Sequence, residues 1–366
     1  MPESLQGDRL LATYRIDAPA AEIRARAEAL AVEQSVEMPL DAIHDERVLA
    51  EVVARVDAIR AVAGGHEVVL GIAPETTGFE PAQLANMLFG NCSLQPEVQL
   101  VDVAFPDAYL RAFAGPRFGV AGLRERLGAH GRPLTCTALK PQGSPVEHLA
   151  ALAGTFARAG IDVIKDDHGI ANQAYGPFER RVPAVQAAVD AANRETGGRT
   201  AYAPTFSGGA HALEAQARIA RDCGVRLALV APMLVGLPAF VELQDRLGIP
   251  VMAHPAFAGA NRMAPALLLG KLFRLLGADA TIFPNHGGRF SYSREACLAI
   301  AAAARSPMGT LRAALPVPAG GMTVERVPGM VADYGTDVML LIGGGLLAAG
   351  NALAARTRAF VAAAAT

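Results

Sequence analysis

The sequence predicts an α/β protein with a C-terminal (β/α)8 TIM barrel and a smaller N-terminal α+β, ferredoxin-like domain. Eight short apolar segments recur through the last two thirds of the 366-residue chain, each bounded by turn residues, as is typical of buried parallel strands. An Ala-rich amphipathic segment follows each of them. A doubly wound open sheet is the runner-up. Its first strand is usually followed by a glycine-rich nucleotide turn, whereas KPQGSP stands here.

The expected strands and helices of the barrel alternate along the chain. Strands are predicted at 134–139, 161–165, 200–205, 226–231, 249–253, 280–283, 315–318 and 338–342. Helices are predicted at 146–159, 181–195, 211–223, 236–246, 262–276, 293–305, 323–334 and 346–364. Eight strand–helix pairs over roughly 230 residues fit a closed parallel barrel.

The N-terminal part of the chain has a different pattern. Strands are predicted at 10–16, 68–74 and 98–105, and helices at 19–33 and 80–88. This order is typical of a split βαβ unit. We therefore expect a domain boundary near the segment FAGPRFGV, with an α+β domain at 1–115 and the barrel at 116–366.

Composition excludes several classes of function. The net charge is −2, so no basic excess points to nucleic acid. No apolar stretch is long enough to span a membrane, and the N-terminus lacks the order of a signal peptide. The four cysteines form no CxxC pair, which favours reduced thiols. We expect a cytoplasmic enzyme with a small-molecule substrate.

Lysine is rare in this chain and its positions are informative. Of 33 basic residues only three are lysines, Lys140, Lys165 and Lys271. Unlike arginine, a lysine can act as a base, a nucleophile or a carbamate carrier. Lys140 and Lys165 end the first two predicted barrel strands, and catalytic residues of such barrels lie at that end. Lys271 falls in a helix and is expected to be structural. Chance survival is the alternative for any one of them.

Other polar groups also follow the predicted strands. Asp167 and His168 come directly after Lys165, and a hard cation such as Mg²⁺ prefers carboxylate oxygen. A helix N-cap is an equally good reading of Asp167. His254 and His286 end the fifth and sixth strands. Glycine clusters follow the seventh and eighth strands, where barrels often bind phosphate through main-chain N–H groups; simple turns are the alternative.

These motifs, in this order, resemble the RuBisCO large-chain superfamily over most of the chain. The segment that leads into the family's barrel resembles FAGPRFGVAGLRERLG. The family's first-strand KPK motif resembles LTCTALKPQG, and its metal motif GLDFTKDDEN resembles GIDVIKDDHG. AGGM and IGGG resemble its phosphate loops on strands 7 and 8.

The resemblance implies a role for each matched residue. Lys165 would be carbamylated by CO₂ and would then ligate Mg²⁺, with Mn²⁺ as a second choice, beside Asp167. Lys140 would move protons at the substrate, and His254 and His286 would match the family's catalytic histidines that end strands 5 and 6. The residues implied to bind substrate or phosphate are Gly321, Gly344, Gly345, Glu33 and Asn91. Glu33 and Asn91 would complete the site of a neighbouring subunit, which implies a homodimer with shared active sites.

Departures from the family pattern argue against carboxylation. His168 stands in place of the second metal carboxylate, either as a ligand that suits Mn²⁺ or Zn²⁺ better than Mg²⁺ or as a proton carrier. An expected arginine is Pro255, and the loop HGGRFSYS has no lysine to hold incoming CO₂. Further departures are Gln142, Ala319, Met38 and Pro39. A RuBisCO-like protein acting on a substrate with at most one phosphate is therefore expected.

The expected chemistry is formation of a metal-stabilised enolate from a sugar-derived, phosphorylated keto substrate. Since His168 replaces a carboxylate that the methionine-salvage enolases keep, we expect a lyase that decarboxylates a 3-oxo sugar acid such as 3-oxo-isoapionate 4-phosphate. The alternative is an enolase or isomerase of a methylthio-ribulose-type phosphate in methionine salvage. A non-catalytic scaffold is a third reading, and the retained Lys140, Lys165 and Asp167 speak against it.

Overall fold

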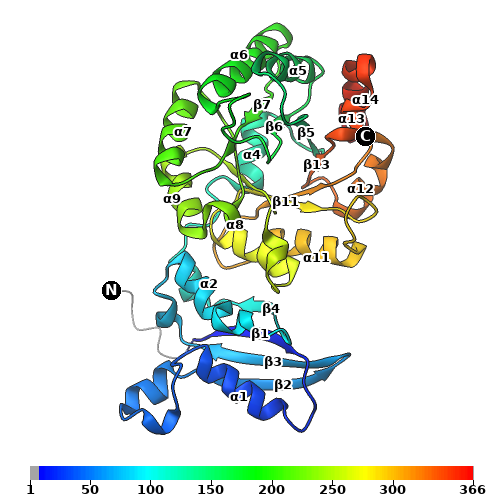
Figure 1. Ribbon diagram of the computed structural model, residues 1–366. Coiled ribbons are helices and arrows are strands. Elements are labelled where there is room, and N and C mark those ends of the chain that lie inside the picture. The colour runs from blue at the N-terminus through cyan, green and yellow to red at the C-terminus, as the bar shows by residue number, and fades with distance from the viewer. Residues whose placement is uncertain (1–7, 366) are drawn as a thin grey trace. The chain divides into compact units, whose positions relative to one another are not determined.

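The computed structural model describes residues 8–365, which divide into two units (Figure 1). The first unit contains the chain up to Ala114 together with Ala258–Leu268 and Pro307–Leu311. The second unit contains Gly115–Phe257, Leu269–Ser306 and the chain from Arg312 onward. The domain limits expected from the sequence, 1–115 and 116–366, stay a prediction. Within the described residues, no helix is long and apolar enough to cross a membrane.

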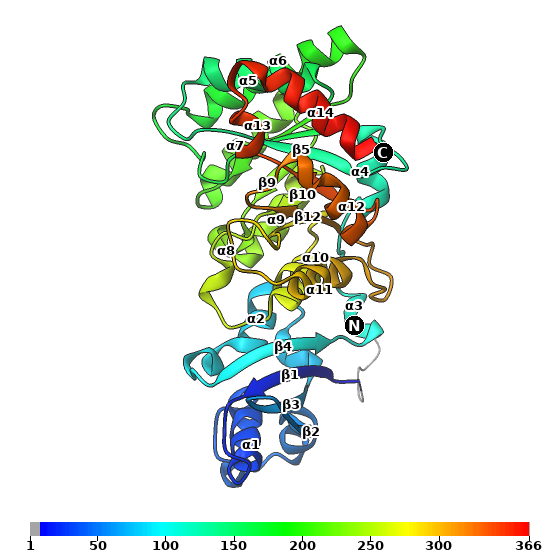
Figure 2. The same ribbon diagram turned by 90° about the vertical axis from the view of Figure 1, so that its right-hand side faces the viewer.

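The first unit is built on an antiparallel sheet with the strand order β2-β3-β1-β4. Its strands are β1 (Leu10–Ile16), β2 (Arg55–Val62), β3 (Gly65–Ile72) and β4 (Val98–Ala104). Its helices are α1 (Ile23–Glu33), α2 (Pro81–Phe89) and α3 (Asp107–Leu110). Helix α1 packs against β2 and β3 (Figure 2). Short 3-10 or π turns lie at Leu40–Ala42, Val48–Val52, Pro74–Thr77 and Asn91–Leu94.

Strand β2 is absent from the sequence prediction. A bulge between Val56 and Ala58 breaks the alternation of polar and apolar residues that identifies a strand. As an edge strand, β2 also leaves Arg55, Asp57 and Arg60 exposed, so its apolar pattern is weak.

The second unit is the predicted barrel, and the fold class is confirmed. Its strands are β5 (Leu134–Leu139), β6 (Val163–Asp166), β7 (Ala201–Ala203), β8 (Thr205–Phe206), β9 (Ala228–Val230), β10 (Val251–Ala253), β11 (Ala280–Pro284), β12 (Leu315–Ala319) and β13 (Met339–Leu341). All strand pairs are parallel, in the orders β13-β5-β6-β7 and β8-β9-β10-β11-β12. Strands β7 and β8 are one barrel position interrupted at Pro204, which has no N–H to donate.

The barrel closes between β12 and β13, which lie side by side without a hydrogen-bonded ladder in the described chain. The Leu315 N–H points toward β11, where it donates to the Asp279 carbonyl. Alternate residues of a strand point the other way, so Pro316 and Pro318 take the positions whose N–H groups would face β13. Since proline has no N–H, this seam depends on side-chain packing.

Helices surround the strands (Figure 1). They are α5 (Val146–Arg158), α6 (Phe178–Thr196), α7 (Ala210–Asp222), α8 (Pro232–Val235), α9 (Leu237–Leu247), α10 (Phe273–Leu275), α11 (Arg294–Arg305), α12 (Val327–Tyr334), α13 (Gly344–Leu347) and α14 (Leu353–Ala365). The helix expected at 236–246 is α9, and the separate short helix α8 ends just before Gly236, which has φ +89°. The helix expected at 262–276 is largely a π-helix, Ala266–Leu272. Short 3-10 turns at Val324–Arg326 and Gly350–Ala352 precede α12 and α14.

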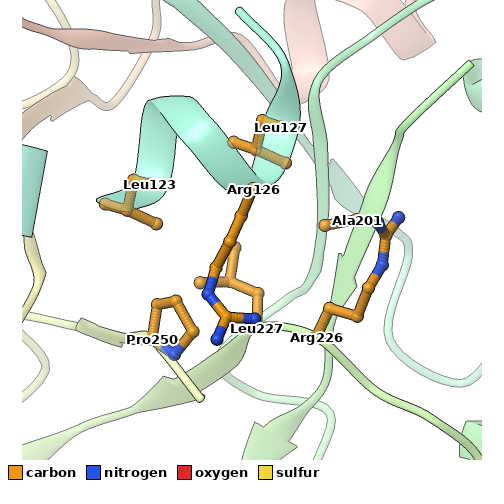
Figure 3. A pocket seen from close by; sticks show the side chains of 7 residues that line it. All are labelled: Leu123, Arg126, Leu127, Ala201, Arg226, Leu227 and Pro250. Atoms are coloured by element: carbon orange, nitrogen blue, oxygen red, sulfur yellow. The ribbon is translucent and has the colours of Figure 1, made fainter. Parts of the chain in front are cut away.

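Helix α4 (Gly119–Leu127) covers the amino-terminal ends of the strands. Leu123 and Leu127 belong to the same buried apolar cluster as the strand interiors. The buried Asp279 carboxylate accepts main-chain N–H groups from Phe118 and Gly119, both at 2.7 Å, and ties the start of the helix to β11. The small pocket in Figure 3 lies here, between α4 and residues at the starts of β7, β9 and β10. It is therefore at the opposite end of the barrel from the predicted site.

Candidate active site

Lys165 lies inside the barrel at the carboxyl end of β6. Its side chain is 4% exposed, and its Nζ donates to the main-chain oxygen of Asp166 at 2.9 Å. The pKa of Lys165 is lowered to about 8, chiefly by burial; Cys136 and Asp166 oppose this shift, and the positive charge of Lys140 adds to it. The amine therefore loses its proton more readily than an ordinary lysine does, as a nucleophile or carbamate carrier requires.

Asp167 joins Lys140 and His168 into one polar cluster. The Lys140 ammonium, which follows β5, forms an ion pair with Asp167 Oδ2. His168 Nδ1 lies 3.0 Å from Asp167 Oδ1, which also accepts the N–H of Gly169. Since α6 begins only at Phe178, Asp167 is not the cap of that helix, and the N-cap reading of this residue is wrong.

His168 and His254 stack on each other, with ring centroids 4.2 Å apart and planes inclined by 12°. His254 Nδ1 accepts the N–H of Ala256 at 3.1 Å, so its proton is carried by Nε2. Burial, reinforced by the charge of Lys165, lowers the pKa of His254 to about 2, and the same causes lower the pKa of His168. Both rings are therefore neutral at neutral pH.

Asp166, the other carboxylate of the motif, is fully buried and has a structural environment. It pairs with Arg181 at 3.2 Å and accepts the Tyr202 hydroxyl at 2.8 Å. Arg181 also donates to the main-chain oxygens of Ala171 and Gly176, in the loop that follows Asp167 and His168. This buried ion pair holds the loop, and nothing local in the sequence points to Arg181 as its partner.

His286 is held by helix α12. Its Nε2 lies 2.8 Å from Asp333 Oδ2, while the Arg294 guanidinium donates to Asp333 Oδ1. Arg326 donates to the His286 carbonyl at 2.9 Å. Over residues 8–365, His286 forms no hydrogen bond or ion pair with Lys140, Lys165 or Asp167, so the structure does not join it to that cluster.

The two predicted phosphate loops need glycine for steric reasons. Gly321 has φ +91°, and a Cβ there would lie 2.9 Å from Arg289 Cγ. A Cβ on Gly345 would lie 2.7 Å from the Met322 carbonyl, whereas one on Gly344 would meet nothing within 4 Å. Arg289 is a residue that the sequence analysis missed, because one exposed arginine among thirty carries no distinguishing local signal.

Glu33 and Asn91 lie together in the first unit. Asn91 Nδ2 donates to Glu33 Oε1 at 2.9 Å, although 58 positions separate them in the chain. Their expected role in a neighbouring subunit's site stays a prediction.

The unmodified side chains offer few metal ligands. Among the described residues, no group of three or more His, Cys, Asp or Glu side chains is placed to hold a metal ion. Asp167 and the free Nε2 of His168 are two adjacent donors, and a carbamate on Lys165 would add oxygen. This donor set fits a divalent cation only if Lys165 is carbamylated and Lys140 releases Asp167.

Comparison with known proteins identifies the family. Residues 119–289 match the ribulose bisphosphate carboxylase large chain, catalytic domain. The chain is 54% identical to a 5-methylthioribulose-1-phosphate isomerase of Rhodospirillum rubrum over 358 residues, which cover 97% of this chain and 96% of that protein. The chain belongs to the RuBisCO-like proteins of the RuBisCO large-chain superfamily.

Solved structures agree with this family. The crystal structure of a Rubisco-like protein from Rhodopseudomonas palustris superposes with a TM-score of 0.92, at 48% identity, and the match covers 98% of each chain.

A second relative by sequence is an enolase. The 2,3-diketo-5-methylthiopentyl-1-phosphate enolase of Geobacillus kaustophilus is 37% identical over 290 residues, which cover 76% of this chain and 70% of that enzyme.

The relatives correct the predicted reaction. The expectation of a decarboxylase of a 3-oxo sugar acid is wrong, since these relatives are named as an isomerase and an enolase of methylthio-sugar phosphates. The error came from His168, which we took as the mark of another branch. The structure places His168 against Asp167 and His254, an arrangement that does not itself select decarboxylation.

Proposed function

We propose that this RuBisCO-like protein isomerises 5-methylthioribulose 1-phosphate through an enediolate. The observation that carries the proposal is the cluster of Lys140, Lys165, Asp167 and His168 at the carboxyl end of the barrel. The full-length similarity to a protein named as that isomerase supports the substrate. The alternative reading from the sequence, methionine salvage, thus becomes the main one.

Isomerising a ketose requires proton removal from a carbon beside the carbonyl and proton return elsewhere on the same enediolate. Lys140 can hold or release a proton at Nζ, since burial and the nearby charge of Arg289 lower its pKa. In the absence of a bound cation, its ion pair with Asp167 keeps that proton at the site. The Nε2–H of His254 is available as a donor to a developing oxyanion.

We further propose a divalent cation, Mg²⁺ or Mn²⁺, held by Asp167, His168 and a carbamate on Lys165. It would supply a Lewis acid for the substrate carbonyl. The lowered pKa of Lys165 supports carbamylation, because CO₂ reacts with the neutral amine. Main-chain N–H groups of Gly321, Gly344 and Gly345 would receive the phosphate.

We also propose a cytoplasmic homodimer in which Glu33 and Asn91 complete the partner's site. The free cysteines of the described chain support a reducing compartment. Mixing Glu33→Gln and Lys165→Met proteins, each expected to be inactive, tests whether sites are shared. After exchange of equal amounts about half of the dimers are hybrids, and each hybrid has one intact site out of two, so about a quarter of full activity should return. No recovery after demonstrated exchange contradicts sharing.

The isomerase assay uses the purified protein with bicarbonate and Mg²⁺ in D₂O. We expect conversion of 5-methylthioribulose 1-phosphate to an isomer that contains one deuterium on carbon, without release of CO₂. Lys140→Met removes the reaction, and Lys271→Met, a change at the third lysine, leaves it intact. Turnover of 2,3-diketo-5-methylthiopentyl 1-phosphate instead would replace the isomerase by an enolase.

A further inference from the structure

Arg289 is an unpartnered cation beside the predicted site. It lies in the loop between β11 and α11, and its side chain is exposed. Within residues 8–365, its guanidinium forms no hydrogen bond and no ion pair; its one ring contact is with the neighbouring Phe290, at 5.7 Å from the centroid. A guanidinium with five N–H donors and no acceptor is suited to an anion that arrives from outside.

The main chain of Arg289 is fastened to the turn after β12. Its N–H donates to the Gly320 carbonyl at 2.9 Å, and its Cγ occupies the space that a Cβ on Gly321 would need. Phe290 packs in the same way over Gly320, where a Cβ would lie 3.0 Å from the ring. These contacts keep the base of the Arg289 side chain at the glycine loop that follows β12.

Charge at this end of the barrel is unbalanced. Asp167 is the carboxylate that faces Lys140, and it is already shared with His168. The other motif carboxylate, Asp166, is neutralised by Arg181. Burial lowers the pKa of Lys140, and the nearby charge of Arg289 lowers it too; burial, Lys165 and Lys140 lower the pKa of His168, with a smaller effect from Arg289. Before Lys165 is carbamylated and a cation binds, Lys140, Lys165 and Arg289 stand against Asp167 alone, an excess of two positive charges that suits an anion such as a phosphate dianion.

We propose that Arg289 binds the phosphate group of the substrate. This inference rests on the proposed function for the identity of the substrate but not for the binding of phosphate. The planar guanidinium would add two parallel N–H donors to the main-chain groups of the glycine loops. Arg289 is then a determinant of specificity for a phosphorylated over an unphosphorylated sugar.

The experiment measures the affinity of the full-length protein for inorganic phosphate, by calorimetry at constant ionic strength set with chloride. Arg289→Ala is expected to weaken phosphate binding about tenfold or more. Arg289→Lys should weaken it by less, because lysine keeps the positive charge but cannot form two parallel hydrogen bonds with phosphate. Arg218→Ala is the matched control. Arg218 is an exposed arginine on the outer helix α7, and its removal should leave phosphate affinity unchanged.

Activity provides a separate readout. Arg289→Ala should raise KM for the sugar phosphate about tenfold and change kcat less. The assignment is overturned if Arg289→Ala binds phosphate like the wild type, if Arg218→Ala loses as much affinity, or if the wild type shows no saturable phosphate binding. A wild type that binds phosphate but does not turn over 5-methylthioribulose 1-phosphate refutes the proposed function alone, and the Arg289→Ala titration still decides the role of Arg289.

Discussion

Replacing Lys165 by Met should make the protein more stable, by an amount that depends on pH. The side chain is 4% exposed, and its pKa falls from the ordinary 10.5 to about 8 on folding. At about 1.4 kcal/mol for each pH unit, keeping this amine charged in the folded state costs about 3 kcal/mol. Methionine fills a similar volume and carries no charge, so it should remove most of that cost.

The sign follows from proton binding. Below pH 8 Lys165 is protonated in both states, and the folded state bears the full cost. Between pH 8 and 10.5 the unfolded chain holds the proton more tightly, so wild-type stability rises with pH. The advantage of Lys165→Met should therefore shrink by about 2 kcal/mol between pH 7 and pH 9.5.

Urea unfolding followed by circular dichroism measures this advantage. The buffers contain a chelator and no CO₂, because a carbamate would remove the amine's charge. Lys271→Met is the control, and its effect should not follow the same pH profile. An advantage that stays constant from pH 7 to 9.5 would refute the reasoning, since it would reflect packing alone. Lys165→Met should abolish isomerase activity at every pH.

Three further outcomes are expected. Asp279→Ala leaves three main-chain N–H groups without an acceptor, two of them buried, and should cost about 3 kcal/mol in urea unfolding, with KM unchanged in the folded protein. A loss below about 1 kcal/mol would contradict the anchoring role of this carboxylate. Gly345→Ala forces a Cβ against the Met322 carbonyl and should raise KM for the phosphorylated substrate about tenfold or more. Gly344→Ala, where a Cβ meets open space, is the control, and equal effects of the two changes would contradict the steric argument. Asp333→Asn should lower kcat/KM about tenfold by releasing His286, and should add nothing in a His286→Gln background. Additive losses would mean that Asp333 acts independently of His286.

The barrel was predictable because its signals are local. Buried parallel strands are short apolar runs, and each of the eight expected strand positions contains a strand of the structure. Strand β2 was missed because its bulge and exposed charges hide the alternation. The helix expected at 236–246 is present as α9, whereas the four-residue helix α8 was missed because so short a segment shows no helical period.

The partners of the site residues were beyond the reach of sequence patterns. Lys140, Lys165 and Asp167 stand out at strand ends, and the structure brings them together. By contrast, Asp333 meets His286 from 47 positions away, and Arg181 on α6 meets Asp166 from 15 positions away. His168 illustrates a different limit. A changed residue type shows that a site differs from its family, but it does not say which reaction has replaced the old one.

The closure of the barrel at Pro316 and Pro318 has a consequence for ligand binding. Strands β12 and β13 lead into the glycine loops at Gly321 and Gly344, so the proposed phosphate would bridge the two sides of a junction that main-chain hydrogen bonds do not close. A phosphate bound at that position would link the ends of β12 and β13 and would stabilise the junction between them. Native-state hydrogen exchange should then show its largest slowing on phosphate binding along β13.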